Sequence, residues 1–70
     1  MARAAHETVR VQIQALPEQF QRVLLLSCLE ELPYEEISHR LRIPIGTVRS
    51  RLFRGRRLLR AVLSGMLTAA

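Results

Sequence analysis

The stretch that decides the fold of this chain is residues 43–60, which read IPIGTVRSRLFRGRRLLR. Pro44 interrupts the preceding pattern, so a helix is expected to begin near Ile45 or Gly46. Apolar residues then recur at steps of three and four and form one stripe: Ile45, Val48, Leu52, Gly55, Leu59, Val62 and Met66. The opposite arc carries Arg49, Ser50, Phe53, Arg54, Arg57 and Arg60. The stretch predicts a helix with a buried apolar side and an arginine-rich outer side.

Three shorter helices are expected before this one. Residues 4–15 contain no breaker and are interpreted as a short helix. Pro17 and Pro33 each suit the first position of a helix, where a missing N–H is tolerated, and glutamates follow both prolines. The second helix should run from Pro17 to about Glu30, and Pro33 should open a third of about nine residues. No segment alternates with a period of two, so the chain is predicted to be all-α, a small helical domain of about four helices.

The third and fourth helices have the layout of a helix-turn-helix over about residues 33–60. Tyr34, Ile37, Ser38 and Leu41 mark the inward face of the third helix. In such a motif the second helix enters the major groove of DNA and its first turns meet base edges. Glycine at position 46 lets backbone approach DNA, a hydroxyl at Thr47 can hold a phosphate, and Phe53 could contact a thymine methyl group. Coiled coils share the stripe spacing, but this stripe lacks flanking glutamates.

The balance of charge points to an anionic partner for the second half of the chain. The net charge is +5, from eleven arginines, no lysine and six glutamates. Residues 1–36 hold three arginines and all six glutamates, whereas residues 37–70 hold eight arginines and no acid. Nucleic acid is the leading candidate for that partner. The alternative is a solvated basic surface without a partner.

Length and composition exclude several other classes. The 70 residues offer one small module, and 49% hydrophobic with 24% charged residues is an ordinary globular mix. The longest uncharged run, residues 61–70, has about half the length of a membrane span. Cys28 has no partner for a disulfide and is interpreted as a small buried apolar residue, and two scattered histidines predict no metal site. No nucleophile, base and acid stand at readable spacing, so neither an enzyme nor a cofactor is expected.

Four short motifs together resemble region 4 of bacterial sigma-70-type sigma factors, and most of all the short extracytoplasmic-function (ECF) group. They are Leu16-Pro17-Glu18, Val23-Leu24-Leu25-Leu26, Tyr34-Glu35-Glu36-Ile37 and residues 43–52. The likeness covers roughly residues 14–63, and residues 46–51 are its most specific part. It implies recognition of the −35 promoter element by a cytoplasmic domain held on the β-subunit flap of RNA polymerase. It also implies that an anti-sigma factor masks the domain.

The resemblance assigns roles to individual residues. The base-reading positions of the family fall on Arg49, Ser50, Phe53 and Arg54, which the helical periodicity also places on the outer arc. Phosphate contacts are expected from Thr47, Arg51, Arg56 and Arg57, with Arg22 and Tyr34 as further candidates. The family's region 2, which melts promoter DNA, has no counterpart, so we expect the chain to be an excised C-terminal domain.

The chain departs from the family pattern in four places. Glu31 stands where glycine commonly ends the second helix, and Pro33 where a hydroxyl cap is common. Arg42 occupies the turn position usually held by glycine, which implies a left-handed backbone conformation. Gly55 replaces the usual alanine inside the long helix, at an expected cost of about 1 kcal/mol. These departures affect the turns and local stability and leave the DNA-facing positions intact.

Two other functions remain open from the residues alone. A response-regulator output domain of the LuxR type would also use a four-helix helix-turn-helix, as a dimer on palindromic DNA. A protein-interaction module would use its arginines on an acidic partner. Val23, Leu24, Leu25 and Leu26 wrap most of the way round the second helix, and Val23, Leu25 and Leu26 are therefore the expected surface for a protein partner.

Overall fold

The computed structural model describes residues 2–65, with side chains from residue 8 onward. Within that part there is no strand, which confirms the all-α prediction. In chain order the elements are α1 (Ala2–Gln14), α2 (Glu18–Leu24), the π-helical turn η1 (Leu25–Leu29), α3 (Tyr34–Leu41) and α4 (Ile45–Leu63).

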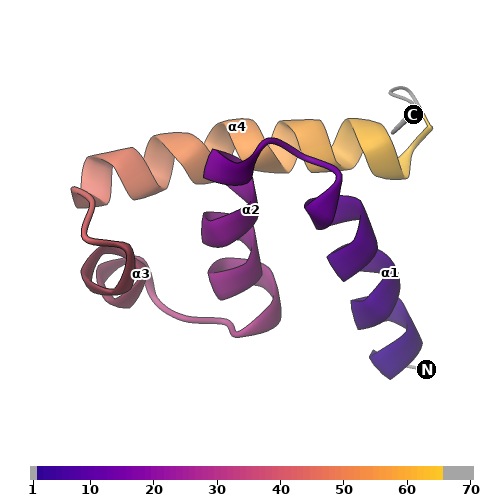
Figure 1. Ribbon diagram of the computed structural model, residues 1–70, viewed down its shortest axis with the longest axis horizontal. Coiled ribbons are helices and arrows are strands. Elements are labelled where there is room, and N and C mark those ends of the chain that lie inside the picture. Colours follow the sequence, from indigo (N-terminus) through magenta and orange to yellow (C-terminus); the bar gives the residue numbers. More distant parts are fainter. Residues whose placement is uncertain (1, 66–70) are drawn as a thin grey trace.

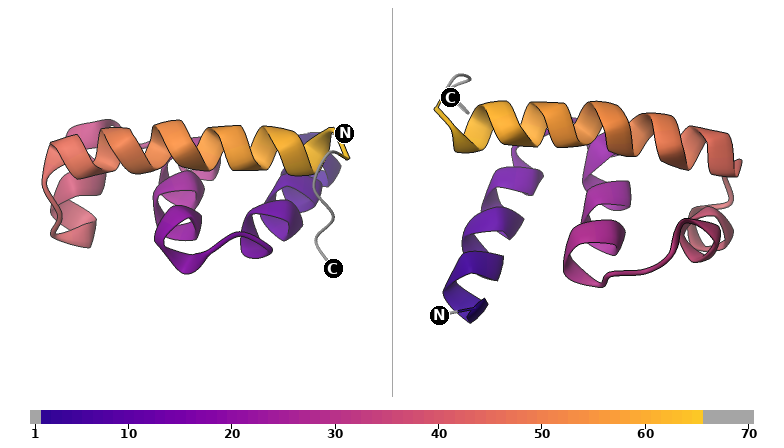
Figure 2. Two further views of the ribbon diagram at one scale, coloured as in Figure 1. Left: turned by 90° about the horizontal axis from the view of Figure 1, so that it is seen from above. Right: turned by 180° about the vertical axis from the view of Figure 1, so that it is seen from behind.

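The long helix α4 lies along one edge of a flat molecule whose principal dimensions are 31 × 25 × 14 Å. Figure 1 shows α1, α2 and α3 on the same side of α4, with α3 beneath its first turns and α1 beneath its last turns. The views from above and from behind show the same arrangement (Figure 2). The opposite side of α4 is therefore left uncovered along its length.

Each of the three prolines stands immediately before a helix, one position earlier than the first helical residue. Pro17, Pro33 and Pro44 have an extended backbone, with ψ between 146° and 156°. The carbonyl of Pro17 accepts the N–H of Phe20 at 2.9 Å, and the carbonyl of Pro44 accepts that of Thr47 at 3.0 Å. Proline loses no bond in this position, because a helix leaves its first N–H groups unpaired.

The second helix ends differently from the expectation of one α-helix running to Glu30. Its last turn is π-helical, and the N–H of Glu30 donates to the carbonyl of Leu25 at 3.2 Å. Glu31 then adopts φ 54°, which reverses the chain toward α3. A positive φ is unfavourable for a residue with a side chain, and glycine is common at this position in the family that the chain resembles.

The turn between α3 and α4 also contains a left-handed residue, as expected. Arg42 has φ 56° and ψ 47°. Ser38 holds the turn from the α3 side: its carbonyl accepts the N–H of Ile43 at 3.2 Å, and its hydroxyl donates to the carbonyl of Ile43 at 2.6 Å. Ser38 therefore stabilises the turn as well as lying on the inward face of α3.

The core draws on all four helices. Its buried members are Ile13, Leu16, Phe20, Val23, Leu24, Ile37, Val48, Leu52 and Leu59. The apolar stripe predicted for α4 is largely confirmed: Val48, Leu52, Gly55 and Leu59 are buried, Ile45 and Val62 are half-buried, and Met66 lies outside the described residues. Within the described part, no helix combines the length and apolar content needed to cross a bilayer.

One of the three residues expected to form a partner surface on the second helix is buried instead. Val23 and Leu24 are both 0% exposed, because α2 packs against α1 as well as against α4. Leu25 and Leu26 are half-buried and also pack against the core, as does Cys28. Val23 is therefore a core residue and was wrongly expected at the surface.

Candidate nucleic-acid interface

The outer arc of α4 is exposed along its whole length, as the helical periodicity predicts. Arg49, Ser50, Phe53, Arg54, Arg57 and Arg60 are all exposed. Neighbouring residues show the contrast, since Leu52 is 1% exposed and Phe53 is 65% exposed. The outer arc therefore presents four arginine cations and one aromatic ring. It belongs to the side of α4 that no other helix covers (Figure 2).

The first turn of α4 is open to a close approach. Apart from the chain neighbours of Gly46 and the nearby backbone of its own helix, no atom of the described part lies within 4 Å of where a Cβ on Gly46 would stand. Thr47 is half-buried, and its carbonyl accepts a hydrogen bond from the Ser50 hydroxyl at 3.2 Å. Because that proton is used inside the helix, the oxygen of the exposed Ser50 can act as an acceptor for a donor such as a base amino group.

A shallow groove of about 280 Å³ joins the start of α3 to the exposed side of α4. Its lining residues are Tyr34, Arg49, Phe53, Arg56, Arg57 and Arg60. The guanidinium carbon of Arg57 stands 5.9 Å from the centre of the Phe53 ring, within range of a cation–π contact. The groove is rich in positive charge and contains two aromatic rings.

A second groove, of about 330 Å³, brings together two predicted phosphate contacts from different helices. Arg22 of α2 and Arg51 of α4 line it with Glu18, Gln19, Leu41 and Ile43. Arg22 also forms an exposed ion pair with Glu18 at 3.8 Å, whereas Arg51 is half-buried at the edge of the arc. These two arginines lie beside the α3–α4 turn.

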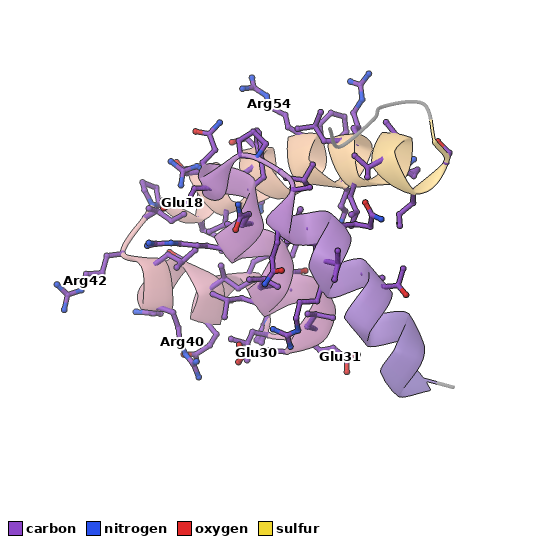
Figure 3. All side chains as sticks on the ribbon, turned by 45° about the vertical axis from the view of Figure 1, so that its right-hand side comes forward. Glu18, Glu30, Glu31, Arg40, Arg42 and Arg54 are labelled. Atoms are coloured by element: carbon purple, nitrogen blue, oxygen red, sulfur yellow. The ribbon has the colours of Figure 1, made fainter. Side chains whose placement is uncertain are left out.

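The charges of the molecule are separated between its edges. Arg54 projects from α4 away from the other helices, whereas Glu30, Glu31 and Arg40 lie at the opposite edge (Figure 3). Arg40 is paired there with Glu30 at 3.9 Å and with Glu36 at 3.4 Å. Among the described residues, the ion pairs thus lie outside the arginine arc, which keeps the positive field on one face.

Arg56 differs from the other predicted phosphate contacts. Its Nη1 donates to the hydroxyl oxygen of Tyr34 at 3.1 Å, and its Nη2 donates to the hydroxyl oxygen of Ser27 at 3.2 Å. The hydrogen bond to Tyr34 is the main cause that raises the pKa of Arg56 above its ordinary value, against a smaller lowering by burial. The sequence did not indicate a role for Ser27. Arg56 is 22 positions from Tyr34 and 29 positions from Ser27, and helical periodicity does not relate residues so far apart.

A family model for region 4 of sigma-70 matches residues 6–59 of the chain. The chain belongs to the sigma-70 region 4 family. The match covers α1 from residue 6 onward, all of α2, η1 and α3, and α4 as far as Leu59. It therefore decides between the two helix-turn-helix interpretations, in favour of a sigma region 4 over a LuxR-type output domain.

Curated sigma factors are similar to this region 4 chain at more than 40% identity. RNA polymerase sigma-H factor of Pseudomonas aeruginosa is 43% identical over 63 residues, which is 90% of this chain and 33% of that protein. ECF RNA polymerase sigma factor SigW of Bacillus subtilis is 42% identical over 53 residues, 76% of this chain and 28% of that protein. ECF RNA polymerase sigma-E factor of Escherichia coli is 48% identical over 44 residues, which is 63% of this chain and 23% of that protein. The chain thus spans about a third or less of the curated relatives it matches.

Proposed function

We propose that this region 4 domain recognises the −35 element of promoters and thereby directs RNA polymerase to initiate transcription. The observation that carries the proposal is the uncovered arc of α4, with Arg49, Ser50, Phe53 and Arg54 exposed on its first turns. Side chains in that position of a helix-turn-helix reach base edges in the major groove. The role is one of binding and not of catalysis.

The proposed contacts divide by chemistry. Arg49 and Arg54 offer paired donors for guanine, Ser50 offers an acceptor, and Phe53 offers an apolar surface for the thymine methyl group. Phosphates are assigned to cations and hydroxyls at the rim of this surface: Thr47, Arg51, Arg57, Arg22 and Tyr34. The shared groove of Arg22 and Arg51 supports their assignment, because one strand of the backbone could contact both.

We further propose that the domain works while attached to polymerase through the β flap, and that an anti-sigma factor competes for it in the cytoplasm. The half-buried Leu25 and Leu26 and the exposed Val11 of α1 are the apolar residues proposed for a protein partner. A single helix in the groove buries little surface, so the free domain should bind promoter DNA weakly. Attachment to polymerase would raise its effective concentration at the promoter without new DNA contacts.

Selection of bound sequences from a random DNA pool tests the recognition step. One asymmetric site with a short AAC-like core is expected. A palindrome bound by a dimer would contradict the proposal and favour a LuxR-type regulator, and no enrichment at all would leave a protein-interaction module as the better interpretation.

A comparison of the free domain with the domain fused to the flap tests the attachment step. The fused domain is expected to bind the selected site more tightly, with the same base preferences. Nanomolar, sequence-specific binding by the free domain at physiological salt would contradict this part of the proposal.

A further inference from the structure

Arg56 lies where three elements meet. It projects from the middle of α4 and reaches Tyr34, the first residue of α3, and Ser27 in η1, through two different nitrogen atoms. The guanidinium group is planar and its donors are fixed in a fork, so two separate bonds hold the group in one orientation. Its raised pKa, caused mainly by the bond to Tyr34, agrees with a cation that is stabilised within the protein.

The bond to Arg56 also fixes what the Tyr34 hydroxyl can do. The oxygen of Tyr34 is the acceptor at 3.1 Å, so its own proton is available to donate in another direction. A hydroxyl that accepts from a cation is polarised and becomes a better donor. Tyr34 lines the charged groove beside Arg49, Phe53 and Arg57, on the side assigned to DNA. A phosphate oxygen is the acceptor that such a hydroxyl would meet there.

The same bonds join the recognition helix to the helix before it. Arg56 stands two helical turns after Arg49, about 10 Å further along the axis. The other end of α3 is joined to α4 by the short turn at residues 42–44. A bridge from Arg56 to the beginning of α3 therefore adds a second, polar restraint to the apolar packing of Ile37 against α4 and helps to fix the angle at which α4 is presented.

We infer that Arg56 is a positioning residue, which orients the Tyr34 hydroxyl toward a DNA phosphate and locks α4 against α3 and η1, and that it does not itself neutralise a phosphate. The part of the inference that concerns DNA binding rests on the proposed function. The bridge itself is independent of that function.

Substitution by lysine separates the two roles of Arg56. Lysine keeps the positive charge and binds phosphates as a point charge, but it cannot direct two forked donors at Tyr34 and Ser27. Arg56→Lys is therefore expected to bind the selected promoter site about threefold to tenfold more weakly than the wild type. The matched control is Arg40→Lys at the opposite edge of the molecule, where Arg40 pairs with Glu30 and Glu36 away from the DNA-facing arc, and it should bind within about twofold of the wild type. Wild-type affinity in Arg56→Lys would overturn the inference.

A double-mutant cycle with Tyr34→Phe provides the second readout. If Arg56 acts through Tyr34, the loss of affinity in Arg56→Ala combined with Tyr34→Phe should equal that of the weaker-binding single variant. Losses that multiply would show that Arg56 contacts DNA on its own and would overturn the inference. Circular dichroism verifies that each variant is folded. If one of these variants does not fold, Ser27→Ala takes its place, because it removes only one of the two hydrogen bonds of Arg56.

The bridge is also measurable without DNA. Thermal unfolding of the free chain should show coupled effects of Arg56→Lys and Tyr34→Phe, and independent effects would contradict the bridge. If the wild type selects no DNA sequence, the proposed function fails, while this measurement still decides whether Arg56 locks the two helices.

Discussion

Gly55 of α4 lies against Leu24 of α2 so closely that a Cβ at residue 55 would stand 3.1 Å from Leu24 Cδ1 and 3.3 Å from Leu24 Cγ. Phe20 Cβ would be 3.4 Å away. Leu24 is fully buried and its side chain has little room to move. The glycine that is unfavourable for helix formation thus lies at a close contact between α4 and α2.

We therefore predict that Gly55→Ala destabilises the domain, although alanine is the better helix former. The gain of about 1 kcal/mol in helix propensity is opposed by overpacking that costs about 1–3 kcal/mol, and the net loss should be about 1 kcal/mol. Thermal or denaturant unfolding measures it. In the Gly55→Ala background, truncation by Leu24→Ala should cost less than in the wild type. A stabilised Gly55→Ala would contradict the close contact.

Arg42→Gly is predicted to stabilise the domain by up to about 1 kcal/mol, because Arg42 has φ 56° and glycine adopts this conformation without strain. His39→Gly is the matched control. His39 is also exposed but lies inside α3, so glycine there should cost about 1 kcal/mol. Equal destabilisation by both substitutions would show that the turn does not require a left-handed residue.

Leu52→Asp and Phe53→Ala should separate folding from DNA binding. Leu52 is in the core, where an unpaired carboxylate is costly, so this variant should unfold. Phe53 is on the exposed arc, so its alanine variant should remain helical and lose mainly affinity for DNA. Circular dichroism reports the first result and DNA titration the second. Loss of helix in Phe53→Ala would contradict the placement of the arc.

Arg49→Ala and Arg54→Ala should each weaken binding to the selected site by about 1–3 kcal/mol and relax the preference at one base pair. Both side chains are exposed on the first turns of α4. Titration against single-base variants of the site measures the effect. An equal loss on all sequences would instead identify them as phosphate contacts.

Arg57→Ala should weaken binding to all sequences evenly and reduce the slope of log affinity against log salt by about one unit. Arg57 lies within cation–π range of Phe53 at the rim of the surface, and a phosphate is its proposed partner. Affinity measured over a series of salt concentrations tests the role. A changed base preference with an unchanged slope would count against it.

The sequence by itself determined the four α-helices and the orientation of α4, but not the π-helical turn that ends the second helix. The period of the apolar residues and the positions of the prolines were sufficient to predict these features. Burial of one apolar stripe requires that the opposite arc, with Arg49 and Phe53, faces solvent. The left-handed turn at Arg42 followed from the position of that residue in the family pattern. These are local or periodic properties of the chain.

The tertiary structure decided which contacts form between the helices. Val23 was expected at the surface and is buried, since the packing of α2 against both α1 and α4 cannot be read from a helical period. The contact of Gly55 with Leu24 and the bridge from Arg56 to Tyr34 and Ser27 each join residues more than twenty positions apart. Side chains so distant meet only after the helices have packed, and their pairing depends on distances that no local pattern encodes.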